Sequence, residues 1–144
     1  MIRPDFPRFG GLDGPEEQPI ATDADVVLVR QLVRQAAVAA KLSLVDQTKL
    51  VTAASELARN TLVYGGGGRA RVELVRDGSR QGVRAEFADQ GPGIADLVLA
   101  LTDGYTTGGG LGLGLSGARR LVDEFDIDTA PGVGTRVTVV KWSR

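Results

Sequence analysis

The chain has 144 residues, a formal net charge of −1 at neutral pH and 20 glycines, about twice the roughly 7% share of an average globular protein. It contains neither His nor Cys, which excludes histidine general bases, autophosphorylation on His, disulfides and zinc sites built on these residues. The charge balance offers no basic field for nucleic acid, and no apolar run approaches the ~18 residues of a membrane span, so we expect a cytoplasmic protein with neither a nucleic-acid nor a membrane partner.

The N-terminal part divides into an extension and the start of a single domain. Residues 1–19 hold four of the six prolines and show neither helical nor strand periodicity, which predicts a flexible extension, with the domain at 20–144. Thr22 and Asp25 form a potential capping box that opens a helix reaching to about Leu42.

A second helix is predicted to begin after Ser43 and to end at the glycine run Gly65–Gly68. Apolar and small residues recur at helical spacing along it. Its predicted core face consists of Leu50, Val51, Ala54, Leu57, Ala58 and Thr61.

The pattern then changes to strand periodicity. Residues 69–76 alternate polar and apolar side chains, Asp77 and Gly78 supply a turn, and a second alternating strand ends at Asp89. This arrangement predicts a β-hairpin.

The C-terminal half reads as a short helix, a loop, a helix and a second hairpin. Together with the two N-terminal helices, this order favours an α+β fold, a two-layer sandwich with a mixed or antiparallel sheet and helices on one face. The predicted ranges are Ile94–Leu101, Thr102–Leu111, Leu113–Phe125, Asp126–Thr129 and Thr135–Trp142.

Glu56 and Asn60 lie four residues apart on the second predicted helix, so they share one face of it. A carboxylate can take a proton from an attacking hydroxyl, and an amide oxygen is a suitable ligand for Mg²⁺. A solvated helix face has the same appearance, so the pair gains meaning only from the motifs that follow.

The segment Asp89-Gln-Gly-Pro-Gly93 follows the second predicted strand. A carboxylate at a buried strand end can accept a hydrogen bond from an exocyclic amine such as that of adenine, and the glycines let the backbone approach a flat base. A turn stabilised by the Asp side chain is the alternative.

Seven of the 20 glycines fall between Gly104 and Gly117, ahead of a predicted helix. Backbone N–H groups at a helix start can hold phosphate oxygens without a lysine, and glycine gives a lid its freedom to move. The segment also contains G-x-G-x-x-G at Gly112–Gly117, but no buried strand precedes it, which argues against a dinucleotide-binding unit.

The order of these motifs is more specific than any one of them. With Gly134-Thr135 at the last strand, they resemble the N, G1, G2 and G3 boxes of the GHKL (Bergerat) ATP-binding fold, shared by gyrase, Hsp90, MutL, histidine kinases and anti-sigma-factor kinases. Within this fold the chain resembles the RsbT-type serine/threonine switch kinases of the bacterial stressosome, from Ile20 to Trp142. The matching segments are Ser55–Asn60, Asp89–Ile94, Asp103–Leu115, Arg120–Phe125 and Lys141-Trp142.

The resemblance implies ATP and Mg²⁺ as cofactors and a role for each matching position. Glu56 would act as base on a substrate hydroxyl, Asn60 would bind Mg²⁺, and Asp89 would bind the adenine amine. The other implied ATP contacts come from the turn after Asp89, the lid and the last strand: Gly91, Gly93, Ile94, Thr106, Thr107, Gly108, Gly109, Gly110, Leu111, Gly112, Leu113, Gly114 and Thr135.

The resemblance also implies a function. The chain would phosphorylate STAS-domain proteins of the RsbS and RsbR kind in a stress-signalling partner switch and, once released, activate an RsbU-like phosphatase. A first alternative is an anti-sigma factor that sequesters a sigma factor and uses ATP mainly to fix its shape. A second, less favoured, is an ATPase without phosphotransfer to protein, in which Glu56 activates water.

Overall fold

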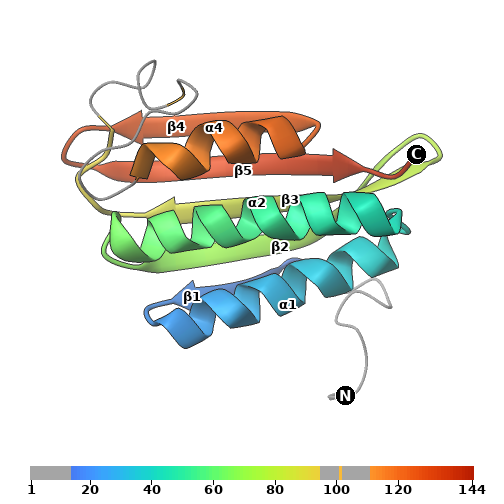
Figure 1. Cartoon of the computed structure of the whole chain (residues 1–144), viewed down its shortest axis with the longest axis horizontal. Coiled ribbons are helices and arrows are strands. Elements are labelled where there is room, and N and C mark those ends of the chain that lie inside the picture. Colours follow the sequence, from blue (N-terminus) through green and yellow to red (C-terminus); the bar gives the residue numbers. More distant parts are fainter. Residues whose placement is uncertain (1–13, 95–100, 102–110) are drawn as a thin grey trace.

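The computed structural model describes residues 14–94, 101 and 111–144, and at 111–114 it describes the backbone alone. Three helices lie side by side over one face of a five-stranded sheet (Figure 1). The strand order is β1-β2-β3-β5-β4, and every pairing is antiparallel, which confirms the expected α+β sandwich. In chain order the elements are β1 (Glu16–Ile20), α1 (Asp23–Ala39), α2 (Leu44–Val63), β2 (Gly68–Asp77), β3 (Arg80–Asp89), α4 (Leu111–Leu121), β4 (Glu124–Ala130) and β5 (Gly134–Trp142).

The first two helices begin where their capping residues predict. The Thr22 hydroxyl accepts the Asp25 N–H at 3.3 Å, and the Asp25 carboxylate accepts the Thr22 N–H at 3.1 Å, which completes the predicted capping box. At the start of α2, the Ser43 hydroxyl accepts the Asp46 N–H at 3.1 Å. All six residues of the predicted core face of α2 are buried.

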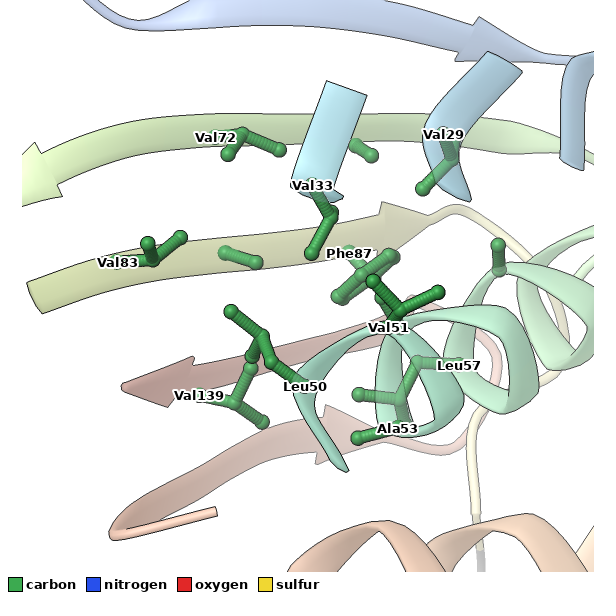
Figure 2. Packing of buried hydrophobic residues seen from close by; sticks show 14 of the residues in the cluster. Val29, Val33, Leu50, Val51, Ala53, Leu57, Val72, Val83, Phe87 and Val139 are labelled. Atoms are coloured by element: carbon green, nitrogen blue, oxygen red, sulfur yellow. The ribbon is translucent and has the colours of Figure 1, made fainter. Parts of the chain in front are cut away.

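The core forms between this helical layer and the strand side chains that face it. Figure 2 shows Phe87 of β3 pointing toward Val51 of α2, and Val139 of β5 lying against Leu50. All four side chains are buried. This packing fixes α2 along the middle of the sheet, so that the last turn of α2 lies near the end of β3.

One predicted boundary is wrong at the N-terminal side. Glu16–Pro19 was expected within the flexible extension, but these residues belong to β1, which pairs with β2. An edge strand hydrogen-bonds on one side only, and in β1 only Ile20 is fully buried, so its sequence shows no clear alternation.

The predicted helix Leu113–Phe125 also has different limits. It runs as α4 from Leu111, which was expected in the loop, to Leu121, and Phe125 lies in β4. Phe125 fits a helical pattern, since it is four residues from Leu121, and also a strand pattern, since it is two residues from Ile127. Apart from Ile94, Leu101 and Leu111, the predicted short helix and loop lie outside the described residues. None of the described helices is both long and apolar enough to cross a membrane.

Candidate nucleotide-binding site

The predicted site residues meet at one end of the sheet. There α2 ends, β2 begins, and Asp89 at the end of β3 pairs with Thr135 at the start of β5. A cavity of about 20 Å³ lies between the helices and this end of the sheet. Its lining residues are Leu57, Asn60, Thr61, Tyr64, Phe87, Asp89, Ile94, Leu115, Thr135 and Val137. Four residues predicted from three separate motifs, Asn60, Asp89, Ile94 and Thr135, therefore line a common space.

Asn60 lies on the last turn of α2 and is half-buried. Its backbone carbonyl accepts the N–H groups of Tyr64 and Gly65 at 3.0 and 3.1 Å. Its side-chain Nδ2 is buried and has no hydrogen-bond partner among the described residues. An unsatisfied buried donor costs roughly 1–3 kcal/mol, so this amide is suited to a bound polar group. An oxygen of a nucleotide phosphate would supply the acceptor that Nδ2 lacks.

Asp89 presents a half-buried carboxylate to the same cavity. Its Oδ1 accepts the Gly91 N–H at 2.8 Å, and the backbone N–H of Thr135 also bonds the carboxylate. Burial raises the pKa of Asp89 above its ordinary value, and the two N–H donors oppose this rise in part. When ionised, this side chain is a pure acceptor. It can therefore receive an exocyclic amine.

The backbone packs closely around this carboxylate. A Cβ added to Gly65 would meet the Asp89 Cβ and Oδ2 at 2.6 Å, and one added to Gly91 would meet the Gly65 Cα at 2.7 Å. Glycine is therefore needed at both positions for this arrangement. The run Gly65–Gly68, which ends the second predicted helix, therefore begins in contact with Asp89.

Hydrogen bonds from both sides hold the turn that follows Asp89. The Tyr64 hydroxyl, at the end of α2, donates to the Gly93 carbonyl at 3.3 Å. From the β4–β5 side, the Gly132 N–H donates to the Pro92 carbonyl at 2.7 Å, and Thr129 Oγ1 accepts the Ile94 N–H at 2.9 Å. These three hydrogen bonds join the turn to the end of α2 and to the β4–β5 hairpin.

The remaining predicted residues lie around the cavity or outside the described part of the chain. Glu56 is exposed on α2, one turn before Asn60, and does not line the cavity. Gly91 and Gly93 shape the turn and are likewise absent from the lining. Leu111–Gly114 form the first turn of α4. Thr106, Thr107, Gly108, Gly109 and Gly110 lie outside the described residues.

Several lining residues were not predicted as site residues, although the sequence contains a signal for most of them. Leu57 and Tyr64 are three residues before and four after Asn60, so they share its helix face. Phe87 and Val137 are two residues from Asp89 and Thr135 on their strands, and so face the same side of the sheet. Leu115 lies four residues after the predicted Leu111 on α4, so the same helical spacing applies to it.

Known proteins share this architecture. Residues 45–143 match the family described as "Histidine kinase-, DNA gyrase B-, and HSP90-like ATPase". The chain is 44% identical over 125 residues to "Serine/threonine-protein kinase RsbT" of Bacillus subtilis (strain 168), which covers 87% of this chain and 94% of that protein. A solved structure of the RsbU and RsbW domains of Rv1364c from Mycobacterium tuberculosis has a TM-score of 0.63 and 24% identity.

The match to that structure covers 92% of this chain but only 33% of the other, and at this identity it concerns the fold. The family match and the RsbT match each span most of this chain. The chain therefore belongs to the family of histidine kinase-, DNA gyrase B- and HSP90-like ATPases and is a homologue of RsbT.

Proposed function

We propose that the chain is a protein serine/threonine kinase that transfers the γ-phosphoryl group of ATP to a Ser or Thr of a STAS-domain protein of the RsbS or RsbR kind. One observation carries the proposal. Asn60, Asp89 and Thr135, from three separate motifs, converge on one cavity in a chain that is 44% identical to a serine/threonine-protein kinase.

The cavity suits the base of the nucleotide. Leu57, Phe87 and Val137 supply apolar surface for a flat ring, and Asp89 supplies the acceptor for the adenine amine. The volume of about 20 Å³ is far below the ~300 Å³ of a typical ligand pocket, so binding requires the lining to move apart.

The phosphates would lie beyond the base, between Asn60 and the start of α4. The N–H groups of the first turn of α4, which includes Gly112 and Gly114, and the positive end of the helix dipole suit phosphate oxygens. Mg²⁺, held by Asn60 Oδ1 and the phosphates, would neutralise phosphate charge when bound.

Glu56 is proposed as the base that accepts the proton of the substrate hydroxyl. Its exposed position on α2, one turn from Asn60, leaves it accessible to a protein substrate. We propose a single ATP-binding domain that includes β1 and extends through β5. After release from its STAS-domain partners in the cytoplasm, the kinase would activate an RsbU-like phosphatase in a stress-signalling switch.

Phosphoryl transfer tests this function. The purified chain is incubated with Mg²⁺, radiolabelled ATP and a STAS-domain protein encoded in the same genome. We expect transfer to Ser or Thr by the wild type, loss of at least 100-fold in rate for Glu56→Gln with unchanged ADP affinity, and no change for the exposed control Glu17→Gln.

Two results would contradict the proposal. The first is equal transfer by Glu56→Gln, which would remove the base from the mechanism. The second is absence of transfer by the wild type together with a stable complex between the chain and a sigma factor, which would favour the anti-sigma factor instead.

A further inference from the structure

Thr129, a residue of β4 outside the predicted motifs, is joined to the nucleotide site by three hydrogen bonds. It lies opposite Thr135 in the β4–β5 pairing and is half-buried. Its Oγ1 accepts the Ile94 N–H at 2.9 Å, donates to the Gly134 carbonyl at 3.1 Å, and lies 2.9 Å from Thr135 Oγ1. One hydroxyl thus contacts the turn after Asp89 and the start of β5.

The chemistry of these partners fixes where the protons lie. A hydroxyl has one proton and two acceptor sites. The Ile94 N–H can only donate to Thr129, and the Gly134 carbonyl can only accept from it. All three contacts are satisfied together in one arrangement only, in which Thr129 gives its proton to Gly134 and the Thr135 hydroxyl donates to Thr129.

The direction in which the Thr135 hydroxyl proton points determines whether this hydroxyl presents a donor or an acceptor to a base in the cavity. Asp89 and Thr135 line the cavity together. Because its proton is donated to Thr129, the Thr135 hydroxyl presents only lone pairs to the cavity. The ionised carboxylate of Asp89 likewise presents only acceptors. A 6-aminopurine carries N–H donors at the position that would meet these oxygens, whereas a 6-oxopurine carries another acceptor.

We infer that Thr129 is a positioning residue that determines base specificity: by holding the Thr135 proton, it keeps this end of the cavity free of donors, so that the site selects a 6-aminopurine over a 6-oxopurine. The inference rests on the proposed binding of ATP at this site. It assigns Thr129 no contact with the nucleotide.

The test compares the affinities of the full chain for ADP and for inosine diphosphate, which differ in the 6-amino and 6-oxo groups, by titration calorimetry. Thr129→Val preserves the shape of the side chain and removes the hydroxyl, and Thr129→Ser retains the hydroxyl. Thr138→Val, on the sheet face away from the helices, is the matched control. Circular dichroism monitors folding, and Thr129→Ala replaces Thr129→Val if the latter does not fold.

We expect the wild type to bind ADP at least tenfold more tightly than inosine diphosphate, because a lost or repelled hydrogen bond changes affinity by about this factor. In Thr129→Val the ratio should fall by about tenfold, since the freed Thr135 proton can be donated to a 6-oxo group. Thr129→Ser and Thr138→Val should keep the wild-type ratio.

The inference is overturned if Thr129→Val keeps the wild-type affinity ratio, which includes weakening both nucleotides equally, or if Thr129→Ser loses this ratio. It is also overturned if the wild type binds ADP and inosine diphosphate equally, a result that would not contradict the proposed function. If the wild type binds neither nucleotide, the proposed function itself fails.

Discussion

Asp89, the proposed acceptor for the adenine amine, carries a cost to folding. Burial favours its protonated form, so the folded chain holds this proton more tightly than the unfolded chain does. The resulting stabilisation is present below the ordinary pKa of 3.8 and is lost as the pH rises through the raised pKa. At pH 7 the ionised side chain is therefore less favourable in the fold than a neutral one.

We predict that Asp89→Asn raises the thermal midpoint of the nucleotide-free protein at pH 7, because the amide oxygen can still accept the Gly91 N–H without the desolvated charge. The same variant should bind ADP at least tenfold more weakly, since an amide offers the adenine amine a poorer acceptor. Thermal scans and calorimetric titrations measure both effects, with exposed Asp126→Asn as control. A lower midpoint or unchanged affinity would contradict this account.

The same carboxylate predicts a pH dependence of binding. As the pH falls through the raised pKa, Asp89 gains a proton and loses acceptor capacity, so ADP affinity should decrease with falling pH. Titrations of the wild type and Asp89→Asn from neutral pH downward, over the range in which both proteins remain folded, separate this effect from general unfolding. A parallel decrease in both proteins would assign it to another group.

At the scale of the elements, α2 carries Glu56 and Asn60, and a side-chain cap stabilises its first turn. The Ser43 hydroxyl accepts the Asp46 N–H at the end of the helix remote from Asn60. Ser43→Ala should lower the free energy of unfolding by about 1 kcal/mol. Urea denaturation measures this change, with Ser79→Ala in the β2–β3 turn as control, and ADP affinity of the folded protein should be unchanged. Equal effects of the two substitutions would exclude a capping role.

The sequence predicts elements well when they carry their own periodicity and end signals. The caps Thr22 and Ser43 and the alternation around the Asp77-Gly78 turn place α1, α2 and the first hairpin within a few residues. β1 and the end of α4 were not predictable in this way, because their state depends on neighbours distant in sequence. The role of Thr129 depends likewise on its cross-strand pairing with Thr135.

At the scale of the whole molecule, a charge cluster forms at the end remote from the nucleotide cavity, where the C-terminus lies (Figure 1). Lys141 of β5 is 4% exposed, and its Nζ lies 3.6 Å from Asp46 and 3.7 Å from Asp123. Arg144 approaches the same two carboxylates from the surface, at 3.8 and 2.8 Å. The cluster joins the first turn of α2, the connection after α4 and the last strand.

Substitutions in this cluster should change the free energy of unfolding without changing nucleotide affinity. Removing one partner of a buried ion pair typically costs roughly 3–5 kcal/mol, and we expect Lys141→Met to approach this range in urea denaturation. Arg84→Met, which removes an exposed cation 3.7 Å from Glu73, should cost about 1 kcal/mol or less. The folded fraction of Lys141→Met should bind ADP with wild-type affinity. If fully folded Lys141→Met bound ADP more weakly than the wild type, the charge cluster and the nucleotide cavity would be energetically coupled.

The acid dependence of stability provides an independent measure of the same cluster. Burial of Asp123 favours its neutral form, but the Trp142 N–H and the charges of Arg144 and Lys141 outweigh this, so that its pKa lies below the ordinary 3.8. Its contribution is complete above about pH 4 and is lost as the pH falls through the lowered pKa. In Lys141→Met the cation that stabilises the ionised Asp123 is absent, so this variant loses less stability on acidification. The stability difference between wild type and Lys141→Met should therefore narrow in the interval below about pH 4. A constant difference across this interval would show that Lys141 acts through packing rather than through its charge.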